Sequence, residues 1–181
     1  MMTDKPIKSI STFFTAAPFY FIEPMGGGKR FVASFQDKAK TKTFLLNFFE
    51  TANEIYVKIR NYENYEKRVE FVGKVTKQKL RDALEKYETL IFHDGYHDLM
   101  IRLPKTEEYV AFDEHGLVYV YTQNDYSGIL NDFGLAYKPA EKLIYEFDHW
   151  HYGPPNAKEN LVQLIKELGL RKERFLFRRK N

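Results

Sequence analysis

The five histidines are the side chains of this sequence best suited to chemistry, and four of them stand in two close pairs. His149 and His151 are two residues apart, so on a strand both imidazoles project to the same face, roughly 6–7 Å apart at their bases. One Zn²⁺ or Mn²⁺ ion could bind both, with Asp98, Asp113 or His97 completing the ligand set. The spacing indicates a candidate metal site at His149 and His151, although a polar strand end at the surface is the favoured explanation.

The second pair, His93 and His97, has the spacing of two zinc ligands on a helix. Asp94 and Gly95 lie between two apolar runs, and this dipeptide is typical of a two-residue hairpin turn. Such a hairpin would send the two imidazoles to opposite faces of the sheet. We therefore expect no joint metal site at this pair.

Other catalytic motifs are incomplete. The run Gly26, Gly27, Gly28 is followed by a predicted strand rather than a helix, so it predicts a hairpin tip and not a phosphate-binding loop. Ser127 lacks the glycine two residues before it that a nucleophile elbow requires. Cysteine is absent, which removes thiol nucleophiles and thiolate metal sites. The sequence thus favours a protein with no catalytic residue and no cofactor.

Acidic and aromatic side chains alternate between residues 93 and 125. Tyrosine and tryptophan are typical anchors of protein interfaces, and acidic charge steers a basic partner towards such a surface. We expect this surface to bind another protein. The residues expected to make the contact are Asp94, Tyr96, Asp98, Asp113, Glu114 and Trp150.

The basic end of the chain offers a third interpretation. Residues 171–181 carry six cationic side chains against the single carboxylate of Glu173. Such a tail can contact phosphate, but it is more often a solvated terminus, so nucleic acid ranks below a protein partner.

The length of 181 residues fits one domain, with residues 1–12 and 171–181 expected to be loose. The chain has no apolar run of the roughly 18–20 residues that a membrane span needs, so no membrane partner is expected. The absence of cysteine is consistent with a reducing compartment, and a cytoplasmic location is expected.

Periodicity predicts an α+β fold, mainly an antiparallel sheet with three to four helices packed on it. Thr76 and Asn156 are expected to cap helices, and Gly134 and Gly169 to end them. The predicted strands cover residues 19–22, 31–35, 55–59, 69–75, 90–93, 97–103, 109–113, 117–121 and 143–151. The predicted helices cover residues 38–51, 127–133, the segment after Thr76 and the segment after Asn156.

The runs 97–102 and 108–121 resemble the sheet segment of small bacterial immunity proteins of polymorphic or contact-dependent toxin systems. The resemblance covers about a third of the chain and brings no functional residue with it. It implies a protein that binds a cognate toxin and blocks it without catalysis, often through an acidic face. This chain departs from that pattern because its formal net charge is +3.

The sequence therefore predicts a non-enzymatic protein-binding domain, with a basic toxin domain as the expected partner. A metal-dependent hydrolase built on His149 and His151 is the first alternative. A nucleic-acid-binding protein that uses the basic tail is the second.

Overall fold

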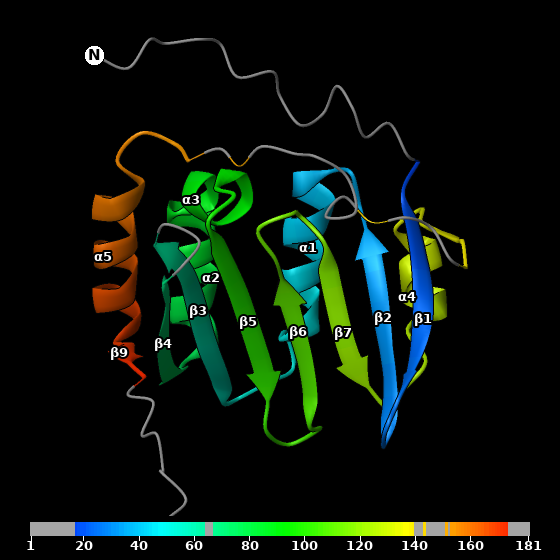
Figure 1. Ribbon diagram of the computed structural model, residues 1–181. Coiled ribbons are helices and arrows are strands. Elements are labelled where there is room, and N and C mark those ends of the chain that lie inside the picture. Colours follow the sequence, from blue (N-terminus) through cyan, green and yellow to red (C-terminus); the bar gives the residue numbers. More distant parts are fainter. Residues whose placement is uncertain (1–16, 64–66, 140–142, 144–150, 152, 174–181) are drawn as a thin grey trace, which may run out of the picture.

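The computed structural model of the protein describes residues 17–63, 67–139, 143, 151 and 153–173. These residues form a nine-stranded sheet with helices packed on it (Figure 1). The strand order is β8-β1-β2-β7-β6-β5-β3-β4-β9, and every neighbouring pair is antiparallel except β1 and β8. The strands are β1 Phe19–Met25, β2 Gly28–Ser34, β3 Ile55–Glu63, β4 Lys67–Val75, β5 His97–Leu103, β6 Glu108–Phe112, β7 Val118–Thr122, β8 Ala136–Tyr137 and β9 Arg171–Lys172.

Side-chain alternation along β3 shows how the sheet acquires two different faces. Ile55, Val57 and Ile59 are buried, whereas the residues between them are exposed or half-buried. Successive side chains of a strand point to opposite faces, so the apolar set packs into the core and the polar set faces outwards. The predicted hairpin of β3 and β4 is confirmed. Gly26 and Gly27 form the tight turn between β1 and β2, as expected for the glycine run.

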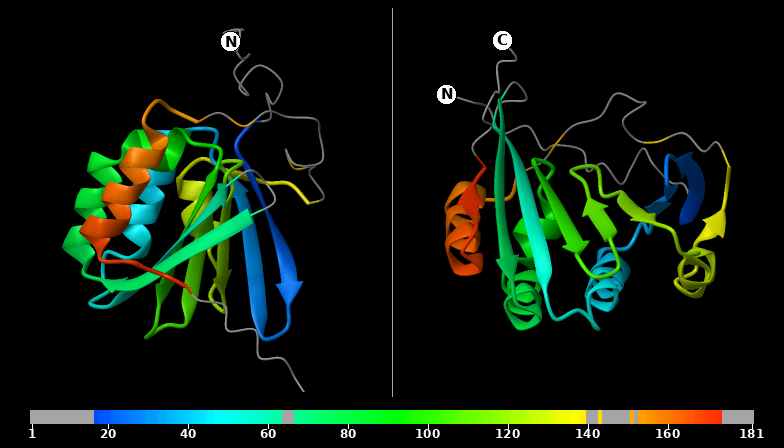
Figure 2. Two further views of the ribbon diagram at one scale, coloured as in Figure 1. Left: turned by 60° about the vertical axis from the view of Figure 1, so that its left-hand side comes forward. Right: turned by 90° about the horizontal axis from the view of Figure 1, so that it is seen from below.

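Five helices are found among the described residues, and Figure 2 shows them together on one face of the sheet. They are α1 Lys38–Phe48, α2 Lys77–Lys86, α3 Glu88–His93, α4 Ser127–Asp132 and α5 Ala157–Leu168. The expected α+β class is confirmed, but the expectation of three to four helices was too low. None of the described helices is long and apolar enough to span a membrane.

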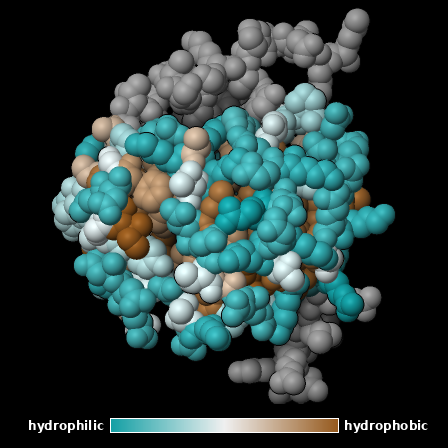
Figure 3. All heavy atoms as spheres, turned by 180° about the vertical axis from the view of Figure 1, so that it is seen from behind, coloured by the Kyte–Doolittle hydropathy of each residue, from teal (hydrophilic) through white to brown (hydrophobic). Residues whose placement is uncertain are grey.

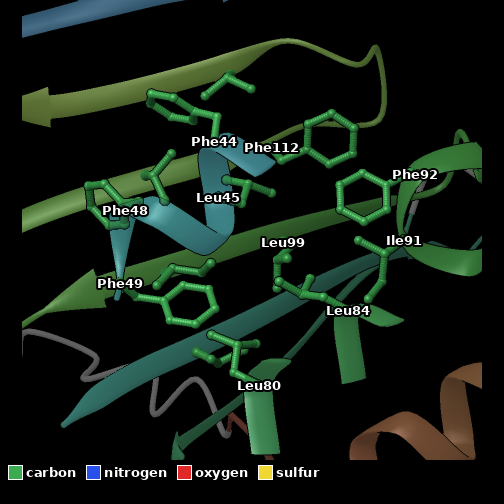
Figure 4. Close-up of a cluster of buried hydrophobic side chains, with 14 of the residues drawn as sticks. Phe44, Leu45, Phe48, Phe49, Leu80, Leu84, Ile91, Phe92, Leu99 and Phe112 are labelled. Carbon is green, nitrogen blue, oxygen red and sulfur yellow. The ribbon is translucent and has the colours of Figure 1, made fainter. Parts of the chain in front are cut away.

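The main core lies between these helices and the sheet. Phe44 and Leu45 of α1 and Leu80 and Leu84 of α2 are almost completely buried and point towards the sheet (Figure 4). Leu80 and Leu84 are four residues apart, which places them on one side of α2, and Phe48 extends the buried side of α1 four residues beyond Phe44. On the outer side of the helices, hydrophilic side chains cover most of the surface, and hydrophobic atoms show only in smaller areas (Figure 3).

The helix α3 corrects the prediction of a strand over residues 90–93. Leu90, Ile91 and Phe92 are buried one after another, and a short apolar run of this kind has no period that separates a strand from a helix. The Asp94 carboxylate accepts a hydrogen bond from the backbone N–H of Tyr96 at 2.8 Å. This turn joins a helix to β5, so the predicted hairpin at Asp94 and Gly95 was wrong.

The two ends of α5 differ in how well the sequence predicts them. At its C-terminus, Gly169 has φ 70° and the N–H of Leu170 donates to the carbonyl of Ile165 at 2.9 Å, which is the predicted Schellman motif. At its N-terminus, Asn156 has φ 60° and its side chain makes no capping hydrogen bond, so the predicted capping box was wrong. The predicted strand 143–151 lies outside the described residues except for Leu143 and His151, neither of which is in a strand.

Candidate functional site

The face of the sheet opposite the helices, to which Tyr56, Lys58 and Arg60 of β3 project, is here called the open face. Residues that pair directly across neighbouring strands share a face, so the register places one continuous row of side chains across seven strands of this face. The row runs Glu23, Arg30, Tyr121, Tyr109, Arg102, Tyr56, Lys74. It contains three tyrosines and two arginines, and each of its members is exposed or half-buried.

Arg30 organises the centre of this row. Its guanidinium lies over the rings of Tyr119 and Tyr121, 5.5 and 5.7 Å from their centroids, and its Nε donates to Glu23 at 2.5 Å. The rings of Tyr109 and Tyr121 are 5.0 Å apart at a tilt of 47°. We call Arg30, Tyr109, Tyr119 and Tyr121 the Tyr–Arg cluster. Contacts between a cation and aromatic faces hold these side chains in fixed positions.

A buried carboxylate, Glu70 of β4, lies elsewhere on the open face with a side-chain exposure of 2%. It accepts hydrogen bonds from Lys58 Nζ at 2.8 Å, from Arg60 Nε at 3.1 Å and from Arg68. Burial acts to raise the pKa of Glu70, but these hydrogen bonds, led by that from Lys58, outweigh it and lower the pKa to about 2. The carboxylate is therefore charged and held beneath the cations that pair with it.

Asp98 of β5 is a second carboxylate withdrawn from solvent. Its Oδ2 accepts hydrogen bonds from Arg60 Nη1 at 2.8 Å and from the Tyr62 hydroxyl at 3.0 Å, and its Oδ1 accepts one from the backbone N–H of Glu114 at 3.2 Å. Burial and the hydrogen-bonded carboxyl group of Glu114 raise the pKa of Asp98 to about 7, against the opposing charge of Arg60.

The turn between β6 and β7 contains a cluster of carboxylate and imidazole side chains. One ligand atom from each of Asp113, Glu114 and His115 lies within 4.8 Å of the others, and all three residues are half-buried. The ring of His115 is 5.2 Å from the ring of His151, measured between centroids. Burial acts to lower the pKa of His115, but the Asp113 carboxylate outweighs it and raises the pKa above its usual range. Two carboxylates and two imidazoles therefore meet at this turn.

The structure brings most of the predicted partner-binding residues together, but not as an exposed acidic patch. Tyr96 contacts the ring of His151 at 5.9 Å between centroids, next to the turn that carries Asp113 and Glu114. Asp98 is bonded to that turn but is buried. Asp94 is buried as well, with its Oδ2 2.9 Å from His97 Nδ1. Trp150 lies outside the described residues.

The predicted metal site is only partly described. His149 lies outside the described residues, whereas His151 lies beside the turn at residues 113–115. Asp113, one of the three residues expected to complete the set, is in that turn, and His97 is instead paired with Asp94. His93 is exposed, with its Nδ1 2.7 Å from Lys38 Nζ. His93 ends α3 and His97 begins β5, so the two residues do not lie on one helix.

The row on the open face is the feature that the sequence did not reveal. Arg30 and Arg102 belong to no recognised binding motif, and the sequence does not indicate which side chains lie beside them. The signal that could have found Arg102 and Tyr56 is the alternation of polar and apolar residues in their strands, which marks them as outward-facing. The row itself needs the register of six strand pairs, and no pattern within one strand contains that information.

No protein-family model, no curated protein and no solved structure matches this chain.

Proposed function

We propose that this chain is a non-enzymatic protein-binding domain whose contact surface is the open face of the sheet, centred on the Tyr–Arg cluster and Arg102. The observation that carries the proposal is that the described helices pack on one face of the sheet, while the other presents exposed or half-buried tyrosine and arginine in one row. Tyrosine and arginine are enriched among the residues that dominate binding energy at protein interfaces.

The charges of the open face support a partner with acidic side chains. Two of its carboxylates, Glu70 and Asp98, are 2% and 4% exposed at their side chains, whereas the side chains of Arg68 and Lys58 are 47% and 32% exposed. The more accessible carboxylates, Glu23 and Glu173, are 37% exposed, and each pairs with a cation of this face. Arg102 is exposed and makes no ion pair with a carboxylate that the structure describes. Around Glu70 and Asp98, solvent therefore reaches the cations before it reaches the carboxylates.

This complementarity replaces the basic partner that the sequence led us to expect. That expectation placed acidic charge at the surface to steer an incoming protein, with Asp94 and Asp98 among the residues that carry it. Both are buried, with 6% and 3% of the residue exposed, and Asp98 faces Arg60.

Neutralisation of a toxin is the specific form of binding that the immunity-protein resemblance suggests, and we propose it as the biological role. The segment that carries the resemblance forms β5, β6 and β7, three adjacent strands that supply Arg102, Tyr109, Tyr119 and Tyr121. The proposed partner is a toxin domain that presents an acidic patch to this face.

The test is coexpression of the full chain with a candidate toxin, followed by measurement of complex formation by calorimetry. Arg102→Glu is the test variant, and Lys158→Glu, an exposed cation of α5 on the helix side, is the matched control. We expect Arg102→Glu to weaken the complex by at least about tenfold because it places an acidic group against an acidic patch.

Lys158→Glu makes the same change of net charge and should leave the affinity within about twofold, since it lies outside the proposed contact. Equal weakening by both variants would mean that only the overall charge matters. Unchanged affinity in Arg102→Glu would remove the open face as the binding surface.

A further inference from the structure

The cluster at the turn between β6 and β7 has the composition of a transition-metal site. Asp113, Glu114 and His115 each place one ligand atom within 4.8 Å of the others. His151 adds a second imidazole, with the two rings edge to face at 63° and 5.2 Å between centroids. Imidazole nitrogen with carboxylate oxygen is a donor set that suits Zn²⁺, whereas Mg²⁺ and Ca²⁺ prefer oxygen ligands alone.

Hydrogen bonds hold the Asp113 carboxylate in one orientation. Its Oδ1 accepts from the backbone N–H groups of His115 and Leu117, at 3.0 and 2.8 Å. Its Oδ2 accepts from the Tyr119 hydroxyl at 3.1 Å and lies 3.4 Å from His115 Nδ1. Carboxylates that bind metals are oriented by hydrogen bonds of this kind. Oδ2 of Asp113 is thereby held next to the His115 imidazole, where both could bind the same ion.

The hydrogen bond of His151 fixes which of its nitrogens can bind a metal. Its Nδ1 is 2.5 Å from the backbone carbonyl of Gly95. A carbonyl only accepts, so Nδ1 carries the proton, and in the neutral ring Nε2 carries the lone pair. Metal-binding histidines commonly donate their second N–H to a backbone carbonyl in this way.

The distances agree with coordination of one ion. At metal–ligand distances of about 2.1 Å, two ligand atoms on a tetrahedral ion are about 3.4 Å apart, and the centres of two bound imidazoles are roughly 5 Å apart. His115 Nδ1 lies 3.4 Å from Asp113 Oδ2 and 3.7 Å from Glu114 Oε1. The separation of the His115 and His151 rings, 5.2 Å, also fits.

We propose that Asp113, Glu114, His115 and His151 form a binding site for one divalent transition-metal ion of the zinc type. The site differs from the metal pair expected from the sequence, because the turn supplies three of its four ligands. Its ligands are not members of the row that crosses the open face, although Tyr119 of the Tyr–Arg cluster donates a hydrogen bond to Asp113.

The experiment is a titration of metal-free full-length chain with Zn²⁺ alone, followed by calorimetry, with Mg²⁺ as the comparison ion. Glu114→Gln and His115→Asn remove one ligand each, the first with almost no change in side-chain volume. His93→Asn is the matched control, because this exposed imidazole lies at the end of α3 beside Lys38. Co²⁺ replaces Zn²⁺ in a parallel titration, because its visible absorption reports ligand number and type.

We expect the unaltered chain and His93→Asn to bind one Zn²⁺ per chain with the same affinity and to leave Mg²⁺ unbound. Glu114→Gln and His115→Asn should each weaken Zn²⁺ binding by at least about tenfold, the lower end of the loss that even supporting residues of a metal site cause. The Co²⁺ spectrum of the unaltered chain should be that of a four-coordinate site with nitrogen and oxygen ligands.

Absence of Zn²⁺ binding by the unaltered chain would overturn the proposal. Binding that survives both Glu114→Gln and His115→Asn but is lost in His149→Asn would also overturn it, because the ion would then depend on the pair expected from the sequence. Thermal unfolding of each metal-free variant checks that it is folded. If His115→Asn unfolds, Glu114→Gln decides the outcome, because an amide in place of a carboxylate relieves repulsion with Asp98.

Discussion

Removing the charge of Glu70 tests the network on the open face. In the variant Glu70→Gln the three cations Lys58, Arg60 and Arg68 lose a common anionic partner. Lowering the pKa of this carboxyl group from 4.5 to about 2 corresponds to roughly 3 kcal/mol of stabilisation by the linkage between protonation and folding. Lys58 and Arg68 remain in contact with solvent, which screens part of this, so we expect a loss of about 1–2 kcal/mol at pH 7.

The sign of the pH dependence follows from the direction of the shift. A carboxyl group whose pKa is lower in the folded chain contributes its full stability above pH 4.5, the value it has when unperturbed, and loses it as the pH falls to about 2. The assay is urea unfolding of the unaltered chain and of Glu70→Gln at several pH values. The difference between their free energies of unfolding should shrink across this acidic window.

Glu54→Gln is the control, because Glu54 pairs with Lys74 at the surface, with 53% and 59% of the two side chains exposed. Its effect on stability should be within error at every pH, as is common for exposed ion pairs. The reasoning would be refuted if Glu70→Gln matched Glu54→Gln at pH 7, or if its deficit persisted unchanged at pH 2.

Three further substitutions test the packing and capping of the helices against the sheet, with urea unfolding as the measurement. Leu84→Ala empties a completely buried position and should cost about 2–5 kcal/mol, so a wild-type midpoint would contradict the core described above. Gly73→Ala places a methyl group 2.9 Å from Leu170 Cδ2 and should cost about 1–3 kcal/mol, whereas no loss would show that this side chain moves aside freely. Thr76→Ala removes the hydroxyl that accepts from the N–H of Lys79 and should cost about 1 kcal/mol, and an unchanged stability would show that the cap is dispensable.

Local patterns in the sequence predict many of the elements but not their arrangement. The alternation of Ile55, Val57 and Ile59 with polar residues predicts β3, and Thr76 marks the start of α2. The pairing of β2 with β7 and of β3 with β5 joins segments far apart in the chain, and nothing within either segment encodes it. Residues 90–93 were misread because the helix face of the sheet buries each of their apolar side chains, whatever their period.

The candidate site shows the same division. Asp98, Asp113 and His151 were singled out from residue type and spacing, and they do lie in or beside the cluster at the turn. Their chemistry could not be predicted, because burial turns Asp98 from a surface charge into a partner of Arg60. Whether a carboxylate is exposed to a binding partner or paired with a neighbouring strand depends on its tertiary environment. A single sequence does not contain that information in any local pattern.

Oxidative footprinting of tyrosines in the free chain and in its complex tests the central claim most directly. The account predicts that binding lowers the reactivity of Tyr56, Tyr109 and Tyr121 in the row of the open face. The exposed apolar residues Ile129 of α4 and Val162 of α5, on the helix side, should react equally in both states. Protection of Ile129 and Val162 with no change at the three tyrosines would contradict the account, because the partner would then bind the helices.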